Sequence, residues 1–312
     1  ENMALTVFND ETGDLPLKIA YIWAKSVLMN SDEVTSKSID ISYDEVVKGL
    51  IHKYKNRALI KVSYQCAAHC RFCTRIRQIG DPSGNLADDE IKNIISYLKR
   101  HSEIEDVILS GGDPFLTPNI TGEMLSKLSE IESIKVLRIG TRLPLQSPKS
   151  FKSLAIDNLL NKIKEISSVK PFYVLIHVNH PDELTNESIA AIKKIKQKSN
   201  ATLLSQTVFL NGVNIDFNTL NSLFKTLYFA GVTPYYIYHC DSVKGIEQYV
   251  GDIELEKEIM RKLRDTLSGI AYPTYIADLE NEYGKYPFDL GIIKTTHNKV
   301  YKSKLHTEIN IT

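Results

Sequence analysis

Three cysteines within eight residues are the feature of this sequence with the clearest chemical meaning. Cys66, Cys70 and Cys73 form a CxxxCxxC spacing directly after a segment typical of a buried β-strand. Thiolates at this spacing can converge on one four-iron, four-sulfur (4Fe–4S) cluster. Because three ligands leave one iron open, that iron can bind a small chelating molecule. The amino and carboxylate groups of S-adenosylmethionine are suited to this.

A structural zinc site is the main alternative for the same cysteines, and it requires four converging ligands. His69 is the immediate neighbour of Cys70, which makes convergence of the two side chains difficult. Cys240 is distant in sequence, although it also follows a predicted strand. We favour the cluster and interpret Cys240 as a small buried residue. The grouping of the cysteines argues against a disulfide framework and for a reducing compartment.

A second candidate feature is the pair Gly111 and Gly112 at the end of the predicted strand Asp106–Ser110. Glycines at this position let the backbone approach a ligand closely, although the same pair could simply form a tight turn. Polar residues lie at or just after the ends of other predicted strands as well: Arg142, His177, Asn179, Gln206, Tyr238 and Asp241. A site built at strand ends takes side chains from several strands at once, so this collection predicts an active site at that edge.

From Ala58 onward the chain alternates short apolar strands with amphipathic helices. The predicted strands are Ala58–Tyr64, Asp106–Ser110, Lys135–Gly140, Phe172–Val178, Thr202–Phe209 and Val232–Tyr238. Helices are expected at Asp89–Arg100 and at Asn186–Gln197, the latter with Thr185 as N-cap. This alternation is typical of a parallel sheet. We expect an α/β fold, a partial (βα)6 TIM-like barrel of parallel strands, with a doubly wound sheet as second choice.

The N-terminal part differs in character, with helices predicted at Leu15–Leu28 and Tyr43–Tyr54. We therefore expect an N-terminal helical segment at 1–55 and a barrel with a cofactor-binding loop at 56–290. A C-terminal tail would follow at 291–312, with its lysines on a solvated face.

The composition is that of an ordinary globular protein, with 312 residues, 43% hydrophobic and 24% charged. The formal net charge of zero gives no electrostatic reason to expect nucleic acid or an anionic membrane as a partner. No apolar run approaches the roughly 18 residues of a membrane span. The first residues show no signal-peptide pattern, so we expect a cytoplasmic protein.

Taken together, the motifs resemble the lysine 2,3-aminomutase family of radical S-adenosylmethionine enzymes. The matching stretches are Cys66–Arg77 (CAAHCRFCTRIR), Ser110–Asp113 (SGGD), Leu137–Pro144 (LRIGTRLP), His177–Glu183 (HVNHPDE), Ser205–Asn214 (SQTVFLNGVN) and Pro234–Asp241 (PYYIYHCD). They occur in the family's order between about Tyr54 and Phe288. The stretch His52–Leu59 (HKYKNRAL) also resembles the branch that modifies a lysine destined for translation elongation factor P.

The resemblance assigns roles around the cluster. It implies that Cys66, Cys70 and Cys73 hold the cluster and that Phe72 lies near the adenine of S-adenosylmethionine. Residues near its methionine amino group are implied to be Ser110, Gly111, Gly112 and Asp113. Gln206 and Tyr238 are implied to line the nucleoside pocket.

The resemblance also implies pyridoxal phosphate bound to Lys285, with Tyr54 and Arg57 in the phosphate-binding segment. A lysine amine can condense with an aldehyde cofactor, which agrees with this role. Family members carry a run of glycines where this chain has 280–283, so a surface lysine is the alternative.

Three further residues are implied to bind the substrate. Arg75 matches the residue that pairs with its carboxylate, and a bidentate guanidinium suits that task. Asp241 and Asp278 match two carboxylates that hold a distal ammonium. Buried carboxylates repel each other unless a cation lies between them, so the pair predicts a basic substrate. The alternative is that each aspartate caps a helix or pairs with a nearby lysine such as Lys244.

The expected activity is a 2,3-aminomutase that moves the α-amino group of a basic amino acid, L-lysine first, to the β-carbon. Arginine or another basic amino acid, or a radical enzyme of the family without pyridoxal phosphate, are alternatives within the enzymes. A non-catalytic iron–sulfur or zinc module is the alternative outside them. The expected partners are a small amino acid, an electron donor such as flavodoxin or ferredoxin, and possible further copies of the chain in a homo-oligomer.

Overall fold

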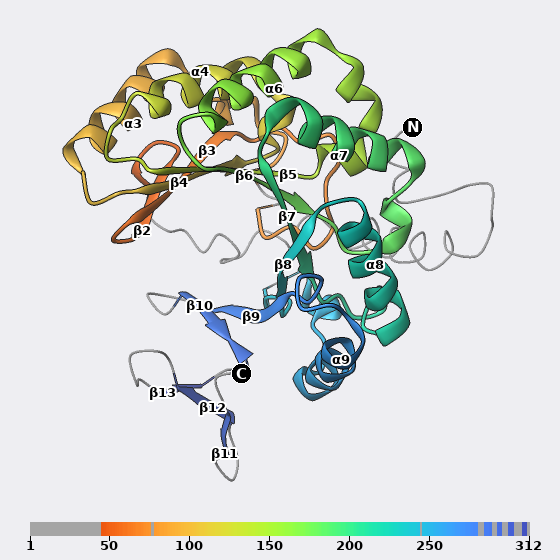
Figure 1. The fold of residues 1–312 in the computed structure, drawn as a ribbon. Coiled ribbons are helices and arrows are strands. Elements are labelled where there is room, and N and C mark those ends of the chain that lie inside the picture. Colours follow the sequence, from red (N-terminus) through yellow and green to blue (C-terminus); the bar gives the residue numbers. More distant parts are fainter. Residues whose placement is uncertain are drawn as a thin grey trace.

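The computed structural model describes residues 45–75, 78–243, 245–279 and 284–288, with short strands at 292–294, 299–302 and 308–310. This part of the chain is an α/β fold with helices packed over one long sheet (Figure 1). The strands of the sheet are β1 Glu45–Val47, β2 Leu50–Tyr54, β3 Arg57–Ser63, β4 Asp106–Gly111, β5 Val136–Thr141, β6 Phe172–His177, β7 Thr202–Val208, β8 Thr233–Tyr238, β9 Thr274–Leu279 and β10 Gly284–Pro287. The helices are α3 Asp88–Arg100, α4 Pro118–Ser129, α5 Leu143–Gln146, α6 Leu154–Ser167, α7 Asn186–Ser199, α8 Phe217–Phe229 and α9 Ile253–Thr266.

The order of the strands in the sheet is the order of the strands in the sequence, from β1 to β10. Neighbours from β3 to β9 pair in parallel, whereas β1, β2 and β10 pair antiparallel at the two edges. A doubly wound sheet reverses its strand order at a switch point, and the described sheet has no such reversal. The strands β11 Ile292–Lys294, β12 Lys299–Lys302 and β13 Glu308–Asn310 form a separate small sheet.

All six predicted strands are present, with ends that differ by one residue at most, as β3 to β8. The helix predicted at Asp89–Arg100 is α3, and the one predicted at Asn186–Gln197 is α7. The Thr185 side chain accepts from the backbone N–H of Ser188 at the start of α7, as its prediction as N-cap requires. The strand β9 is an addition to the prediction, so the parallel part of the described sheet has seven strands.

The helix predicted at Tyr43–Tyr54 is wrong, because the described residues of that segment form the hairpin β1–β2. Gly49 adopts a positive φ of 82° at the turn, which ends any helix there. The backbone N–H of Gly49 donates to the Glu45 carboxylate, and its carbonyl accepts from Lys61 on β3. Residues 1–44, with the helix predicted at Leu15–Leu28, lie outside the described residues.

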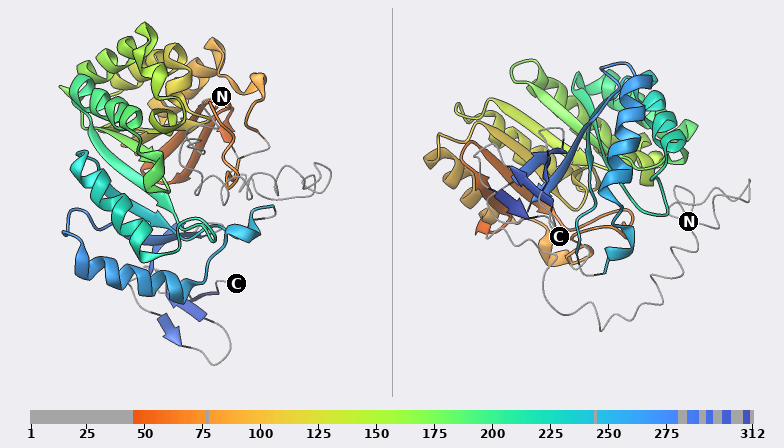
Figure 2. Two further views of the ribbon diagram at one scale, coloured as in Figure 1. Left: turned by 90° about the vertical axis from the view of Figure 1, so that its right-hand side faces the viewer. Right: turned by 90° about the horizontal axis from the view of Figure 1, so that it is seen from below.

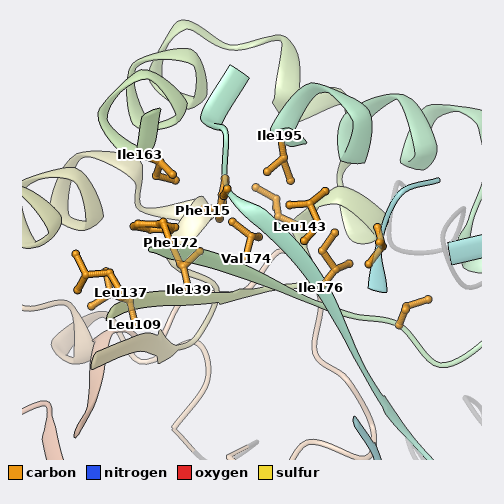
Figure 3. Packing of buried hydrophobic residues seen from close by; sticks show 14 of the residues in the cluster. Leu109, Phe115, Leu137, Ile139, Leu143, Ile163, Phe172, Val174, Ile176 and Ile195 are labelled. Carbon is orange, nitrogen blue, oxygen red and sulfur yellow. The ribbon is translucent and has the colours of Figure 1, made fainter. Parts of the chain in front are cut away.

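The hydrophobic core lies between the sheet and its helices. Figure 2 shows the helices gathered along one face of the sheet in two further views. Leu109 and Ile139 from the strands meet Ile163 from α6 and Ile195 from α7 in this layer, all of them buried (Figure 3). Side chains alternate along a strand, so their neighbours Ser110 and Gly140 face the opposite side of the sheet. Among the described helices, none is long and apolar enough to cross a membrane.

The two edges of the sheet approach each other. Tyr54 lies on β2 and Lys285 on β10, at opposite ends of the strand order. The charge and the backbone of Lys285 nevertheless act on the pKa of the Tyr54 hydroxyl, so the two residues lie close together. The sheet therefore curls around the face that is not covered by helices, and this is the face that carries the polar residues of the predicted site.

Candidate active site at the carboxyl ends of the strands

The three clustered cysteines lie together in the loop that follows β3. Each is partly buried, and the backbone N–H of Cys73 donates to the carbonyl of Cys70 at 3.1 Å. Burial raises the pKa of Cys66 to about 12, with further contributions from the negative charges of Asp113, Cys70 and Cys73. The three sulfurs are therefore close enough to influence one another.

Gly111, the last residue of β4, and Gly112 clamp the beginning of this loop. The backbone N–H of Gly112 donates to Ser63 at 2.5 Å, and that of Asp113 donates to Gln65 at 2.7 Å. Gly111 has a φ of 106°, and a Cβ on Gly112 would lie 2.2 Å from the Gln65 carbonyl oxygen. The close backbone approach that glycines permit is thus used by the chain itself, just before Cys66. Contact of these glycines with a ligand stays a prediction.

Asp113 joins the same clamp to the next strand. Its buried carboxylate accepts from the Thr141 hydroxyl at 2.8 Å, and from the backbone N–H groups of Phe115, Arg142 and Leu143 at 3.0, 2.6 and 2.8 Å. These donors come from the chain, so Asp113 fixes the strand end that carries Arg142. Its predicted role near the methionine amino group stays untested.

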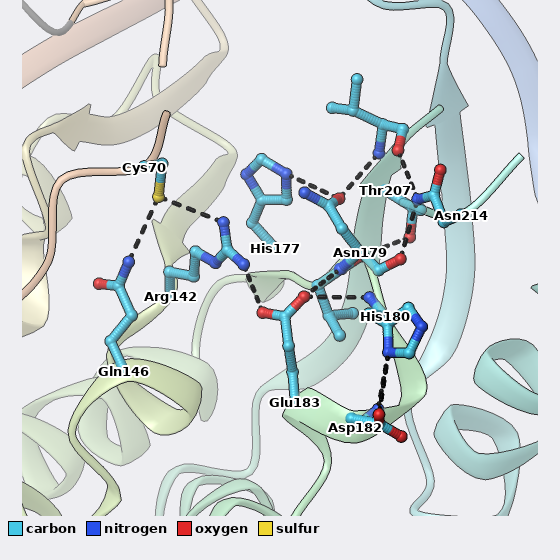
Figure 4. A network of polar contacts seen from close by, with 12 residues as sticks. Cys70, Arg142, Gln146, His177, Asn179, His180, Asp182, Glu183, Thr207 and Asn214 are labelled. Atoms are coloured by element: carbon cyan, nitrogen blue, oxygen red, sulfur yellow. Dashed lines mark hydrogen bonds and ion pairs between the residues drawn. The ribbon is translucent and has the colours of Figure 1, made fainter. Parts of the chain in front are cut away.

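Arg142 connects this strand end to the cysteine loop (Figure 4). One guanidinium nitrogen donates to the Cys70 sulfur at 3.2 Å, and the other pairs with Glu183. The amide nitrogen of Gln146 donates to the same sulfur at 3.3 Å. Burial alone would lower the pKa of Arg142, but Cys70 and Glu183 raise it above its usual value, so the guanidinium stays charged.

Phe72 lies between the cysteine loop and the strand ends. The Arg142 guanidinium carbon is 5.2 Å from the centroid of its ring, and the His177 ring is 5.4 Å away edge-on. Burial, with the neighbouring Arg142 charge, lowers the pKa of His177 to about 3, so this imidazole is neutral. Phe72 also packs against a small apolar cluster that contains Cys240, which is 1% exposed. This agrees with the interpretation of Cys240 as a small buried residue.

Gln206 and Tyr238, predicted together for the nucleoside pocket, are in direct contact. The Gln206 amide nitrogen donates to the Tyr238 hydroxyl at 2.9 Å. Burial raises the pKa of Tyr238 to about 12, against the opposing charge of Lys285. The Lys285 Nζ lies over the Tyr238 ring, 4.7 Å from its centroid. The structure therefore brings Gln206, Tyr238 and Lys285 into one group.

The hairpin β9–β10 places Lys285 directly opposite Asp278. Their side chains form an ion pair of 2.6 Å, and both are about one-third exposed. Burial would lower the pKa of Lys285, but Tyr238 and Asp278 hold it above its usual value. On the other side of Lys285, the Arg57 guanidinium carbon lies 4.2 Å from the centroid of the Tyr54 ring.

Arg75 and Asp241, the remaining predicted substrate ligands, lie at separate strand ends. One Arg75 guanidinium nitrogen donates to the Ser110 hydroxyl at 3.2 Å and to the Gly111 carbonyl at 2.8 Å. Asp241 follows β8, whose end is joined to β9 by the His239 N–H donating to the Ile276 carbonyl at 2.8 Å. Asp241 therefore follows β8, and Asp278 lies near the end of the adjacent strand β9. Lys244, the alternative partner of an aspartate, lies outside the described residues.

Comparisons with known proteins identify the family to which this chain belongs. The sequence pattern of the Radical SAM superfamily matches residues 60–222. The chain is 38% identical over 242 residues, 77% of its length and 64% of the relative's, to a putative L-lysine 2,3-aminomutase of Aquifex aeolicus. It is 33% identical over 247 residues, 78% of its length and 70% of the relative's, to L-lysine 2,3-aminomutase of Escherichia coli. The chain belongs to the lysine 2,3-aminomutase family of radical SAM proteins.

The family also contains a relative named for a different amino acid. Glutamate 2,3-aminomutase of Clostridioides difficile is 32% identical over 273 residues, 84% of this chain and 63% of that protein. The chain thus spans less than two-thirds of the Aquifex and Clostridioides relatives. A radical SAM methyltransferase from Sphaerobacter thermophilus shares the fold, with a TM-score of 0.51 at 18% identity, over 73% of this chain and 68% of that one.

Membership of the radical SAM superfamily implies a 4Fe–4S cluster and S-adenosylmethionine, and the residues present fit the cluster. Three partly buried thiols share one loop, and the buried N–H donors of Arg142 and Gln146 point at the sulfur of Cys70. Among the described residues, no group of three or more His, Cys, Asp or Glu side chains is arranged to hold a single metal ion. A cubane needs no such arrangement, because its thiolates bind separate irons.

Two side chains of this family member are not identified by the sequence patterns. Gln146 reaches Cys70 from α5, and Glu183 holds Arg142 from the turn after β6. Gln146 lies four residues after Arg142, so both lie on one face of a helical turn, and this spacing could have identified it. Glu183 lies in the matching stretch His177–Glu183, but no spacing in the sequence indicates that it pairs with Arg142.

Proposed function

We propose that this chain is a radical SAM, pyridoxal-phosphate-dependent 2,3-aminomutase that moves the α-amino group of a basic amino acid, L-lysine first, to the β-carbon. The observation that carries this proposal is the grouping of Lys285, Asp278 and Tyr54. An amine, a carboxylate and the segment that we propose to bind a phosphate lie close together there. We also propose that the curled sheet is a partial barrel, with its site at the carboxyl ends of the parallel strands.

When bound, the cluster would supply the electron for reductive cleavage of S-adenosylmethionine, and pyridoxal phosphate would supply an aldehyde for the substrate's amino group. Cys66, Cys70 and Cys73 bind the cluster. Phe72 and the Gln206–Tyr238 pair bound the space for the nucleoside. We propose a low-potential protein such as flavodoxin or ferredoxin as the source of the electron.

The surroundings of Lys285 suit a phosphorylated aldehyde. Arg57 brings a guanidinium beside Tyr54, and Lys53 lies over the same ring, with its Nζ 5.7 Å from the centroid. Burial, together with the nearby charge of Lys285, lowers the pKa of Lys53, which favours an anion as its partner. The two cations, Arg57 and Lys53, would together hold a phosphate group near Lys285.

The charges at the strand ends support a basic substrate. Asp241 follows β8 and Asp278 lies near the end of the adjacent strand β9, and a substrate ammonium between them would relieve their repulsion. The Arg75 guanidinium uses one nitrogen for Ser110 and Gly111, and its other N–H groups remain suitable for the substrate carboxylate. Glutamate would bring a third carboxylate toward the two aspartates, so we propose that this chain differs in substrate from its glutamate-specific relative.

A radical SAM enzyme without pyridoxal phosphate is the second candidate, and one observation favours it. The ion pair of Lys285 with Asp278 gives both side chains a partner without any cofactor. An enzyme of this kind would cleave S-adenosylmethionine and show no pyridoxal absorbance band.

The deciding experiment is anaerobic incubation of the reconstituted, reduced protein with S-adenosylmethionine, pyridoxal phosphate and single amino acids, followed by mass analysis. We expect a β-amino isomer from L-lysine and none from glutamate. Lys285→Ala serves as the control, because it should abolish the isomer and retain the cluster. Reductive cleavage of S-adenosylmethionine with no β-amino product from lysine, arginine or ornithine would contradict the proposal.

A further inference from the structure

The sulfur of Cys70 receives two side-chain N–H donors that the family assignment does not explain. The Arg142 Nη1 and the Gln146 Nε2 lie 3.2 and 3.3 Å from it. Figure 4 shows both groups directed at the sulfur from one strand end and the helical turn that follows it. We propose that Arg142 and Gln146 set the reduction potential of the cluster through these hydrogen bonds. The inference rests on the cluster of the proposed function.

The two donors are held in place by contacts that leave them little freedom. The Arg142 guanidinium pairs with Glu183 and lies over the Phe72 ring. Glu183 is buried in turn, and its other oxygen accepts from the backbone N–H groups of Asn179 and His180 at 2.8 and 3.0 Å. A carboxylate fixed by two backbone donors is a rigid support for the guanidinium.

Gln146 is held by burial, and its side-chain oxygen has no hydrogen-bond partner among the described residues. It is the last residue of α5, and its side chain is 6% exposed. Asp113 anchors the start of this segment through the backbone N–H groups of Arg142 and Leu143. A buried amide is costly unless it has a partner, and the partner of the Gln146 N–H group is the Cys70 sulfur.

The donors distinguish Cys70 from its neighbour in the loop. Within the described contacts, Cys70 receives two side-chain donors, one of them cationic, whereas Cys73 receives the backbone N–H of Arg75 at 3.4 Å. Hydrogen bonds to cluster sulfurs and the local net charge are established determinants of iron–sulfur potentials. Cys70 is therefore the ligand through which this chain can adjust its cluster.

The direction of the effect follows from the charge of the cluster. Reduction transfers one electron from an external low-potential donor to the oxidised cluster, with no proton and no bond broken. The added negative charge is shared with the thiolate sulfurs, so N–H donors and a guanidinium stabilise the reduced form more than the oxidised form. Removing a donor must therefore lower the midpoint potential.

The test is a redox titration of the reconstituted protein monitored by electron paramagnetic resonance. Gln146→Met removes the N–H donor while retaining an unbranched side chain of similar length. At a fixed donor potential we expect its ratio of reduced to oxidised cluster to fall about tenfold, which is 59 mV for one electron. Arg142→Lys keeps the charge and shortens the reach, and should lower the potential less. Gln197→Met, on the exposed face of α7, is the matched control with no change expected.

Failure of this inference is separable from failure of the proposed function. A wild-type protein that forms no 4Fe–4S cluster overturns both. A cluster with unchanged potential in Gln146→Met and Arg142→Lys overturns only the inference. If Gln146→Met does not retain a cluster, electron–nuclear double resonance of the reduced wild type in D2O decides instead. Deuterons coupled to the cluster that weaken in Arg142→Lys support the inference, and their absence in the wild type overturns it.

Discussion

Lys285 and Asp278 face each other across the β9–β10 hairpin, and Nζ of the lysine lies 2.6 Å from Oδ2 of the aspartate. The sequence places them seven positions apart, a separation that leaves the tertiary contact undetermined. The antiparallel register makes them direct partners on one face of the hairpin. Any reaction of the lysine amine must therefore begin by releasing its proton in the presence of this carboxylate.

The first prediction concerns the pH at which Lys285 reacts with an aldehyde. Tyr238 and Asp278 hold the pKa of Lys285 above its usual value although burial opposes them, and only the neutral amine can attack an aldehyde. Asp278→Asn removes a negative charge, so the pKa falls and attachment of pyridoxal phosphate should begin at lower pH. Borohydride reduction at a series of pH values, followed by the absorbance of the labelled protein, measures the pH at which attachment begins. Asp265→Asn on the exposed side of α9 is the control, and an unshifted profile in Asp278→Asn would contradict the prediction.

The second prediction separates the two cofactor sites. Lys285→Ala should lose borohydride-stable pyridoxal labelling, because it removes the amine that lies over the Tyr238 ring. The cluster absorbance and the iron content should stay unchanged, since the cysteines lie in a loop after β3 and not on the hairpin. Peptide mapping of the labelled wild type checks the assignment directly. Recovery of the label on another lysine would show that the proposed attachment site is wrong.

The third prediction concerns the charge of the substrate. Asp241→Asn should raise the KM for lysine about tenfold or more, because one charge-assisted hydrogen bond is worth at least ~1.4 kcal/mol. The kcat should change less, since the ammonium lies far from the migrating nitrogen. Steady-state kinetics with lysine and glutamate provide the measurement, with the exposed Asp182→Asn as control. Unchanged kinetics on lysine, or efficient turnover of glutamate by the wild type, would exclude the proposed role.

The fold can be predicted from the sequence wherever one local pattern dominates. Strands such as Phe172–His177 are short, apolar and β-branched or aromatic, and α3 repeats isoleucines at helical spacing. The segment 43–54 is misleading because its apolar residues Val46, Val47, Leu50 and Ile51 recur at helical spacing. Its conformation is decided by the positive φ of Gly49 and by pairing with β3. That this segment pairs with β3 is a feature of the tertiary structure, and no local sequence pattern indicates it.

In the site, too, local sequence patterns identify some residues, whereas tertiary contacts decide the roles of others. The cysteine spacing identifies the loop, but the role of Gly111 and Gly112 depends on which backbone lies against them. A bound ligand and the backbone of Gln65 would each require a residue without Cβ at this position, so the glycines alone do not distinguish the two. Asp113 likewise reads as a turn residue, and the Phe115 N–H makes that local contact, but its donors Thr141, Arg142 and Leu143 come about 30 positions later, from the end of β5 and the residues after it. Such contacts follow from the parallel sheet and become visible only with it.

The last prediction compares Gly112, where the structure leaves no room for a Cβ, with Gly122, where it leaves room. A Cβ on Gly112 would lie 2.2 Å from the Gln65 carbonyl oxygen and 2.6 Å from its nitrogen, so the backbone before Cys66 would have to move. Gly112→Ala should therefore lower the free energy of unfolding by about 2–3 kcal/mol and reduce cluster loading. Gly122 lies in α4, where a Cβ would have nothing within 4 Å of it. Gly122→Ala should instead stabilise the protein by about 0.5–1 kcal/mol and leave cluster loading unchanged, because alanine has the higher helix propensity. Urea unfolding of the apoprotein and iron analysis after reconstitution measure the two effects separately. A Gly112→Ala variant as stable and as fully loaded as the wild type would show that the clamp on the cysteine loop is not needed.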